Sequence, residues 1–333
     1  MPDYRSHHAE LSKGRYDADI GGFMKNLRLL LSLTNNDNDY QVEQAKSAGE
    51  FAQRLGVDLQ VIHADNDAIN QSQQLLKVIQ SNSEAQPDGI IFEPVGGTAF
   101  PQVARAAAAA GISWVVLNRD VDYINELRRS FKVPLFAVTS DHEEIGRIQG
   151  RQFAALLPKG GSVLYIQGPS ESSAAKLRTS GMYETKPPDV QVKIMKGQWT
   201  ESSAQRAVAA WLRLSTSQQT RVDLIAAQDD SMAVGARKAF QELPQGEARD
   251  RWLSLPFTGC DGMPKTGQAW VRSGLLAATV IVPANAGQAV EMLAHAVRTG
   301  TIPPERTLTK PICFPALDAL ASSAAAKAKA TSV

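Results

Sequence analysis

The stretch LTNNDNDYQ, residues 33–41, gathers three asparagines, two aspartates and a tyrosine ahead of a segment with helical periodicity. It follows an apolar run, LRLLLSL, at residues 27–33. Asn and Asp side chains bond neighbouring backbone groups and cap helices, so turn formation alone explains this composition. A binding function for the stretch therefore needs support from residues elsewhere in the chain.

Polar side chains recur directly after several other apolar runs. They are Asn118 and Arg119 after ISWVVL, Asp141 and His142 after FAVTS, Trp199 after VKIMKGQ, Asp229 and Asp230 after VDLIAAQ, and Asp261 after LPFTGC, with Arg178 in the helical segment after SVLYIQGPS. One such residue is typical of a turn. Recurrence at the same end of many strands indicates a shared site, because open α/β sheets bind ligands beyond the carboxyl ends of their strands.

These residue types suit a neutral ligand with many hydroxyl groups. Each hydroxyl both donates and accepts, so carboxylates and amides paired with arginine form charge-assisted hydrogen bonds to it. Tyr40 and Trp199 offer flat faces to the C–H surface of a sugar ring. Structural alternatives remain open: Tyr40 as a core or surface aromatic, Asp229 with Asp230 as a helix N-cap pair, and Asp261 as a turn residue before Gly262.

Glycoside hydrolysis is a second chemistry for the same residues, since it uses two carboxyl groups about 5–10 Å apart. Asp229 with Asp261 is the pair to test. No histidine is placed as a proton shuttle, because His142 is expected to begin a helix. Hydroxyl binding without a reaction is therefore favoured, and no catalytic residue is assigned.

Metal and nucleotide sites lack their signatures. In a calcium loop starting at Asp37, the places of the required Gly and Glu hold Val42 and Ala48. GxSxG, HExxH and GxxxxGK[ST] are absent, and no GxGxxG follows the first apolar run. Cys260 and Cys313 stand outside any CxxC or His-rich setting and are expected to be free thiols. No metal and no cofactor is expected.

Composition excludes further classes of protein. The 333 residues include 35 basic and 34 acidic ones, with a formal charge of +1, and no long basic stripe. Nucleic acid is therefore not an expected partner. No run reaches the ~18 apolar residues of a membrane span. Residues 1–26 show neither the pattern of a secretory signal nor that of a helix-turn-helix.

Apolar runs with strand character alternate with segments of helical period through most of the chain. This alternation predicts βαβ units and parallel sheets. About ten strands exceed one comfortable sheet, so two α/β lobes are expected. In the first helical segment, an apolar stripe runs from Val42 to Leu55, and Gly56 is expected to end the helix in the left-handed conformation.

Six motifs occur in order between about Leu27 and Pro311: PDGIIFEPV with VVLNRD, VTSDHEEIGRIQG, AAKLRTSGM, DLIAAQDDSMAVGARKAF, FTGCDG and SGLLAATVIVPANAG. Together they resemble the periplasmic sugar-binding proteins of ABC transporters, of the ribose, galactose and xylose type, whose core LacI-type repressors share. The resemblance implies a type I periplasmic binding protein: two Rossmann-like parallel-sheet lobes joined by a three-crossover hinge.

Carried over by position, the resemblance implies a ligand-binding set of Asn38, Tyr40, Gln41, Asn118, Arg119, Arg178, Trp199, Asp229 and Asp261. Arg178 matches an arginine that grips ring and hydroxyl oxygens. Asp229 stands where relatives place Asn, which favours a ligand with an extra donor group. Cys260 replaces an aromatic and Val282 an amide, and residues 121–134 are expected to lengthen a loop near the hinge.

The resemblance also implies a domain plan and a function. Residues 27–138 with 283–312 form the first lobe and 139–282 with 313–325 the second, flanked by an N-terminal extension (1–26) and a flexible tail (326–333). The expected protein is a monomeric, periplasmic solute-binding protein that delivers a monosaccharide or polyol to an ABC permease. A sugar-sensing domain for a signalling partner is the alternative, favoured by the missing export signal.

Overall fold

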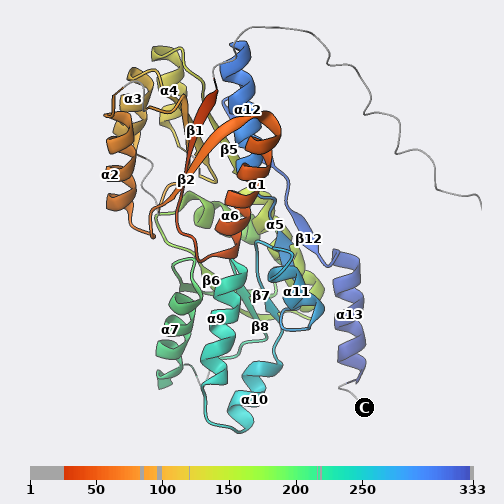
Figure 1. The fold of residues 1–333 in the computed structure, drawn as a ribbon. Coiled ribbons are helices and arrows are strands. Elements are labelled where there is room, and N and C mark those ends of the chain that lie inside the picture. The colour runs from red at the N-terminus through yellow and green to blue at the C-terminus, as the bar shows by residue number, and fades with distance from the viewer. Residues whose placement is uncertain are drawn as a thin grey trace, which may run out of the picture.

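The computed structural model describes residues 26–330, except residues 83–85, 96–99, 120, 216, 218 and 219. The predicted N-terminal extension thus lies outside the described residues, apart from Asn26. Two parallel sheets, each covered by helices on both faces, form two lobes, drawn one above the other in Figure 1.

The first lobe is built on a six-stranded parallel sheet with the strand order β11-β5-β4-β3-β1-β2. Its elements are β1 (Leu27–Leu33), α1 (Asp39–Leu55), β2 (Val57–His63), α2 (Ala68–Ile79), β3 (Gly89–Phe92), α3 (Pro101–Ala109), β4 (Ser113–Leu117), α4 (Tyr123–Ser130), β5 (Leu135–Ser140), α12 (Ala286–Thr299) and β11 (Arg306–Thr309).

The second lobe has a four-stranded parallel sheet of order β7-β6-β8-β9 and an antiparallel pair, β10 with β12. Its elements are α5 (His142–Leu156), β6 (Gly161–Gln167), α6 (Ser173–Thr185), β7 (Val190–Lys196), α7 (Glu201–Leu212), β8 (Leu224–Ala227), α9 (Asp230–Gln241), α10 (Glu247–Ser254), β9 (Phe257–Thr258), α11 (Gly267–Arg272), β10 (Thr279–Ile281), β12 (Ile312–Phe314) and α13 (Leu317–Ala330).

Each sheet separates two apolar cores, because successive side chains of a strand point to opposite faces. On β1, Leu29 and Leu31 pack with α1 and α12, whereas Leu30 packs with α2, α3 and α4. On β6, Ile166 packs with α7 and α9, and Tyr165 packs with α5 and α6. Buried strands covered on both faces account for the continuous apolar runs of the sequence.

The chain passes between the lobes three times, from β5 to α5, from β10 to α12 and from β11 to β12. The predicted fold, two parallel-sheet lobes with three crossings, is confirmed. β5 continues to Ser140, past the predicted lobe boundary at residue 138. The exact lobe ranges remain a prediction.

Three local expectations differ from the structure. Val42 is 48% exposed and Gln44 is fully buried in its place, because Gln44 bonds Asn285 of the second crossing. Within residues 121–134, Tyr123–Ser130 form α4, where a loop near the hinge was expected. Ile124 and Leu127 are three positions apart, and both enter the core. α13 includes residues 326–330 of the expected tail, in keeping with the high helix propensity of Ala and Lys.

Candidate functional site

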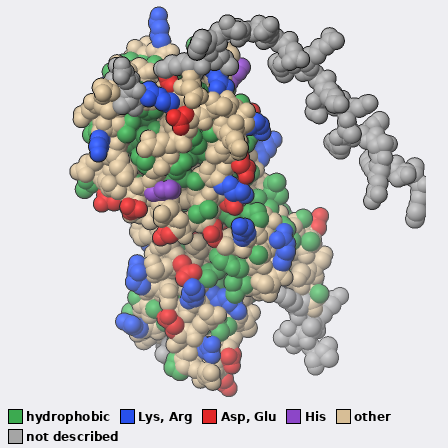
Figure 2. Space-filling view, in the orientation of Figure 1, with side chains coloured by type: hydrophobic (Ala, Val, Ile, Leu, Met, Phe, Trp, Pro, Cys, Tyr) green, Lys and Arg blue, Asp and Glu red, His purple; other side chains and the backbone are tan. Residues whose placement is uncertain are grey.

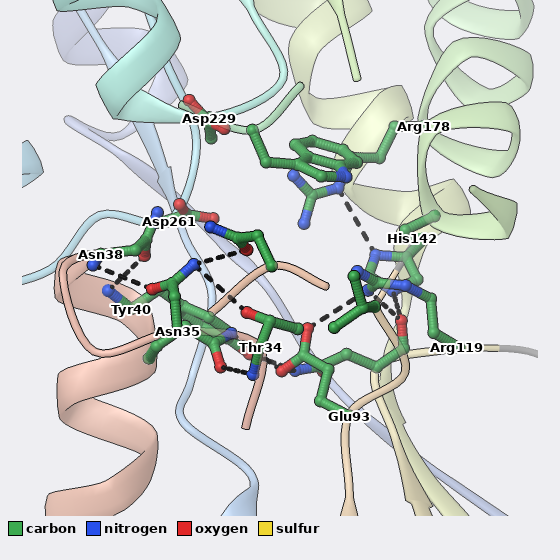
Figure 3. A pocket seen from close by; sticks show the side chains of 16 residues that line it. Thr34, Asn35, Asn38, Tyr40, Glu93, Arg119, His142, Arg178, Asp229 and Asp261 are labelled. Atoms are coloured by element: carbon green, nitrogen blue, oxygen red, sulfur yellow. Dashed lines mark hydrogen bonds and ion pairs between the residues drawn. The ribbon is translucent and has the colours of Figure 1, made fainter. Parts of the chain in front are cut away.

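All nine side chains of the predicted ligand-binding set line one cavity between the two lobes (Figure 3). The set is Asn38, Tyr40, Gln41, Asn118, Arg119, Arg178, Trp199, Asp229 and Asp261. Seven further residues complete the lining: Thr34, Asn35, Asn66, Glu93, Val95, His142 and Ala174. Most of them follow the carboxyl ends of parallel strands, and the two sheets direct these ends at each other.

The loop after β1 is shaped by its own amides. Oδ1 of Asn35 accepts a hydrogen bond from the backbone N–H of Asn38, at 3.1 Å. Oδ1 of Asn38 caps α1 by accepting from the N–H of Tyr40, at 2.8 Å. Asn38 is therefore a helix cap as well as a lining residue. Its Nδ2 group has no partner among the described residues and is free to donate to a ligand.

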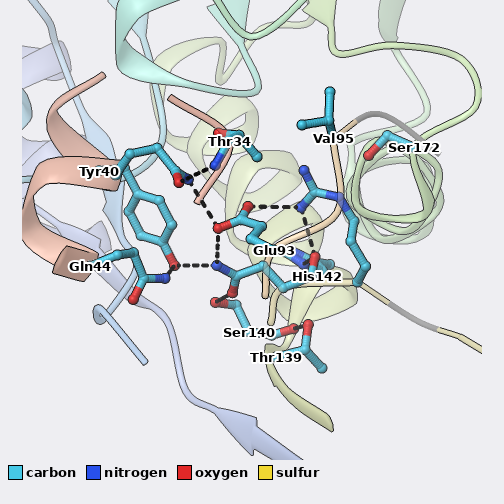
Figure 4. Close-up of polar contacts among 12 residues, drawn as sticks. Thr34, Tyr40, Gln44, Glu93, Val95, Thr139, Ser140, His142 and Ser172 are labelled. Atoms are coloured by element: carbon cyan, nitrogen blue, oxygen red, sulfur yellow. Dashed lines mark hydrogen bonds and ion pairs between the residues drawn. The ribbon is translucent and has the colours of Figure 1, made fainter. Parts of the chain in front are cut away.

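The Tyr40 hydroxyl accepts hydrogen bonds from Nε2 of Gln44 and from Nδ2 of Asn118, both at 3.0 Å (Figure 4). The ring packs with Cys260 and Val282 in an apolar cluster that includes the start of the second crossing. Burial raises the pKa of the phenol, with Glu93 adding to the shift. Tyr40 thus lies on the hinge side of the cavity as a neutral, anchored ring.

The Asn118 side chain is saturated by protein partners. Its Nδ2 group also donates to Oε2 of Glu93 at 3.2 Å, and its Oδ1 accepts from Nδ2 of Asn285 at 2.7 Å. Gln41 donates to the same Glu93 oxygen at 3.0 Å. These contacts give Asn118 a positioning role, in which it holds Tyr40 and Glu93 at the cavity wall (Figure 4).

Arg119 and Glu93 form a buried ion pair, with NH1 of Arg119 3.3 Å from Oε1 of Glu93. The same NH1 group donates to the Asn118 carbonyl at 2.8 Å. Burial lowers the pKa of the Arg119 guanidinium, and Glu93 partly offsets this shift. Nε of Arg119 is buried and has no hydrogen-bond partner. A buried donor without a partner costs free energy that a bound acceptor would restore.

His142 begins α5, as predicted, and its imidazole joins the two lobes. Nε2 lies 3.1 Å from the carbonyl oxygen of Asn118, and Nδ1 lies 3.4 Å from Nε of Arg178. Since Arg178 donates to Nδ1, the proton of the neutral ring is on Nε2 and points to Asn118. Burial lowers the His142 pKa, as do the cations of Arg178 and Arg119, so the ring is neutral at pH 7.

Arg178 and Trp199 come together from α6 and the loop after β7. The guanidinium carbon of Arg178 lies 5.4 Å from the centre of the Trp199 ring, a cation–π arrangement. NH1 of Arg178 donates to the carbonyl of Gln228. Trp199 rests on Gly168, where an added Cβ would lie 2.3 Å from the indole. Nε1 of Trp199 is buried without a partner.

Three carboxyl groups follow β8 and β9. Asp229 caps α9 through Oδ1, which accepts from the N–H of Met232, while its Oδ2 is buried without a partner. Both oxygens of Asp230 are occupied, by the N–H of Gly262 and the hydroxyl of Thr279, each at 2.7 Å. Asp230 therefore fixes the loop after β9 and does not face the cavity.

Burial raises the pKa values of these carboxyl groups, to about 6 for Asp229 and about 8 for Asp230. The Asp261 pKa is raised well above its usual range, first by burial and then by Asp229, Asp230 and Glu93. For Arg178, burial acts to lower the pKa, but Cys260, Asp261 and Asp229 outweigh it and the pKa rises. Arg178 is thus the cation that this acidic region surrounds.

Backbone strain is concentrated at the cavity. Four lining residues other than glycine adopt positive φ: Asn66 (58°), Asn118 (55°), Trp199 (58°) and Asp261 (103°). Such conformations cost about 1–3 kcal/mol each and persist where the surrounding structure enforces them, often at ligand sites. The cost is greatest for a bulky residue such as Trp199.

Glu93 and His142 are the main lining residues outside the predicted set. His142 directly follows a strand, as several residues of the predicted set do. It is absent from the set because its place at the start of a helix already explains it. Glu93 also follows a strand, β3. A single acidic residue before Pro94 is not enough to indicate a binding site from the sequence. In the described part of the chain, no group of three or more His, Cys, Asp or Glu side chains is arranged to hold a metal ion. Cys260 and Cys313 are free thiols, as predicted.

Residues 29–301 match the model of the periplasmic binding protein domain. The chain belongs to the periplasmic binding protein family. The prediction of a binding protein rather than an enzyme is confirmed by this membership. Across the helices that the structure describes, none has the length and apolar character required to cross a bilayer.

This periplasmic binding protein is similar to curated and solved relatives. It is 30% identical over 200 residues to a putative rhizopine-binding protein of Rhizobium meliloti, a match that covers 58% of this chain and 60% of the relative. It is 26% identical over 282 residues to the D-apiose import binding protein of Paraburkholderia graminis, covering 82% of each chain. The crystal structure of a galactofuranose binding protein superposes with a TM-score of 0.74 at 22% identity, covering 91% of this chain and 99% of that one. The last likeness shows a shared fold.

Proposed function

We propose that this protein captures a monosaccharide or related polyol in the cavity between its lobes and delivers it to the permease of an ABC importer. The observation that carries the proposal is a set of three buried polar atoms without partners at the cavity wall: Nε of Arg119, Nε1 of Trp199 and Oδ2 of Asp229. Two are donors and one is an acceptor, and they come from both lobes. A ligand rich in hydroxyl groups serves both kinds, because each hydroxyl donates and accepts.

The size of the cavity supports a small ligand. About 80 Å³ of it is open to the centre of a water molecule. A cavity needs only ~10–15 Å³ on this measure to hold one water, so this space holds several. A single sugar ring displaces a comparable number of waters, whereas an oligosaccharide needs a groove that continues out of the cavity.

The relatives support the same class of ligand and partner. Their names state import of D-apiose and binding of rhizopine or galactofuranose. These names favour transport over the alternative of a sensing domain, and they support a periplasmic location. We propose a monomer in the periplasm that presents its closed form to the permease. Acidic and basic side chains are interspersed over the visible face in Figure 2, in keeping with a partner other than nucleic acid.

Lobe closure would couple capture to delivery. Ligand contacts to Arg119 on the first lobe and to Asp229 and Trp199 on the second exist together only in the closed form. A ligand that binds the closed form better shifts the population toward it. The short crossing from Ser140 to His142 is one place where the chain would bend.

A thermal-shift and calorimetric panel tests the proposal. The panel contains aldoses, ketoses, inositols and the amino derivatives of each. At ~100 times Kd, a true ligand adds ~2.7 kcal/mol to the stability of the folded protein. One or more members should therefore raise the melting temperature and titrate with a stoichiometry of one. If no member of the panel stabilises the protein, the proposed function is wrong.

A further inference from the structure

The carboxyl groups that line the cavity outnumber its cations by one. In the first lobe, Glu93 is matched by Arg119, at 3.3 Å. In the second lobe, two carboxyl groups, Asp229 and Asp261, share a single cation, Arg178. His142 adds no positive charge, because burial and the two arginines lower its pKa.

Arg178 does not neutralise either aspartate by direct contact. Its guanidinium donates to the Gln228 carbonyl and to Nδ1 of His142, and its face covers Trp199. Among the described residues, no ion pair within 4.0 Å joins Arg178 to a carboxylate. Gln228, His142 and Trp199 thus hold Arg178 at the cavity. The two aspartates keep oxygens that can still accept hydrogen bonds.

The Asp229 side chain is an acceptor without a partner. The residue is 2% exposed. Its Oδ1 accepts the hydrogen bond that caps α9, and its Oδ2 has no hydrogen bond. The carboxylate of Asp261 also accepts no hydrogen bond from the described residues, and a positive φ of 103° holds its backbone. A buried carboxylate in this state requires a proton or an external cation.

We propose that the ligand carries a protonated amine in addition to its hydroxyl groups, as an amino sugar or amino polyol does, and that Asp229 and Asp261 hold the ammonium group. This inference rests on the proposed function and narrows its ligand class. An ammonium group supplies a third cation, in place of the proton that otherwise neutralises one aspartate, and up to three donors to acceptors that lack them. A hydroxyl supplies one donor and no charge.

Other ligand charges fit less well. A phosphate or carboxylate would add a negative charge beside Asp229 and Asp261 and would compete with Glu93 for Arg119. A metal ion lacks a ligand group of three suitable side chains within the described ranges. A neutral polyol is compatible with the cavity, but it leaves one aspartate to be neutralised by a proton.

Matched ligand pairs test the proposal by calorimetry at pH 7.5. Each pair consists of a polyol and its amino derivative: D-glucose with D-glucosamine, D-galactose with D-galactosamine, and scyllo-inositol with scyllo-inosamine. The N-acetylated amines serve as neutral counterparts of the same skeleton. For the skeleton that fits, we expect the amine to bind at least tenfold tighter than the hydroxyl parent, and the N-acetyl form to lose this gain.

The variant Asp229→Asn removes the charge and keeps an oxygen that caps α9. We expect it to reduce the amine preference to less than threefold, because the amine loses a charge partner and therefore more affinity than the hydroxyl parent. Asp67→Asn is the matched control, because Asp67 caps α2 through the N–H groups of Ile69 and Asn70 and lies outside the cavity. It should leave the preference unchanged.

The outcomes separate this inference from the function on which it rests. If a neutral polyol binds as tightly as its amine, or tighter, the inference is overturned and the proposed function stands. If no member of any pair and no member of the wider panel binds, the proposed function fails as well. A tenfold amine preference that persists in Asp229→Asn would also overturn the assignment of the ammonium to this carboxylate.

Discussion

Nε of Arg178 donates a hydrogen bond to Nδ1 of His142 across 3.4 Å. The imidazole is held in turn by its Nε2, 3.1 Å from the carbonyl oxygen of Asn118. A neutral histidine next to the first crossing thereby orients an arginine of the second lobe. The position of Arg178 in the cavity depends on this acceptor.

Replacing His142 by Phe keeps a ring of similar size and removes both hydrogen bonds. We expect the variant to bind ligand about tenfold more weakly, since a hydrogen bond to a charged group contributes roughly 1.5–3 kcal/mol. Calorimetry with the tightest ligand of the panel measures this loss. His63→Phe, at the end of β2 and outside the cavity, is the control. Unchanged affinity in His142→Phe would show that His142 does not position Arg178 for ligand binding.

The packing of Trp199 on Gly168 gives a second prediction. In Gly168→Ala the new Cβ would lie 2.3 Å from the indole, so Trp199 must move. We expect ligand binding to weaken by about tenfold, a loss of about 1.4 kcal/mol, with every side chain at the cavity wall still present. Gly49→Ala is the control, because nothing lies within 4 Å of an added Cβ there. Wild-type affinity in Gly168→Ala would show that the indole position is unimportant.

Trp199 itself should matter to binding more than to folding. Its strained backbone (φ 58°) and unpartnered Nε1 offset much of what its partial packing against the core of the second lobe contributes to stability. We expect Trp199→Ala to weaken binding by more than about tenfold, as the loss of a stacking face and a donor implies. The melting temperature of the unliganded protein should change little. A large fall in that temperature would instead identify Trp199 as a core residue.

The pH dependence of amine binding follows from Asp229. Burial raises its pKa to about 6, so the carboxylate gains a proton as the pH falls through that value. An ammonium group binds the ionised form, and affinity should therefore fall about tenfold between pH 7.5 and pH 5. Calorimetry across this range checks the prediction. Asp229→Asn should reduce the dependence, because only the Asp261 carboxyl group then titrates beside the ammonium. An unchanged slope in this variant would show that Asp229 does not bind the ammonium.

Asp230 should control the pH dependence of folding. Burial raises its pKa from 3.8 to about 8, so the folded protein holds a proton that the unfolded chain releases. This stabilisation is complete below pH 3.8 and is lost as the pH rises through about 8. In Asp230→Asn, the amide can accept from Gly262 and donate to Thr279. We expect the variant to melt at least about 3 °C higher than wild type at pH 8.5, and to differ less at pH 5.

Denaturation of both proteins from pH 5 to pH 8.5 measures this effect. Asp141→Asn, which changes the N-cap of α5, is the comparison. If Asp230→Asn lowers the melting temperature equally at every pH, the ionised carboxylate is the form that the folded protein requires.

Much of the site is predictable from the sequence because open α/β sheets bind ligands beyond the carboxyl ends of their strands. Polar residues after β1, β4, β7, β8 and β9 share a cavity because parallel strands direct their carboxyl ends to one edge. The strands themselves are recognisable as apolar runs, because helices cover both faces of each sheet and bury every side chain of a central strand. The periodicity of α4 was missed because only Ile124 and Leu127 enter the core from a short, charged helix.

Individual roles within the cavity depend on contacts that the sequence does not show. Asn118 lies where the resemblance placed it, yet its amide is fully occupied by Tyr40, Glu93 and Asn285. Gln44 is buried through a bond to a residue 241 positions away. Such long-range pairs arise only once the lobes are folded together.

A crystal structure of the protein with the tightest ligand of the panel would show directly whether the cavity between the lobes is the binding site. We expect one small molecule between the lobes, in contact with Arg178, Trp199 and Asp229 and with the Asn38 loop of the opposite lobe. A ligand bound elsewhere, or an empty cavity at saturating ligand, would contradict this expectation.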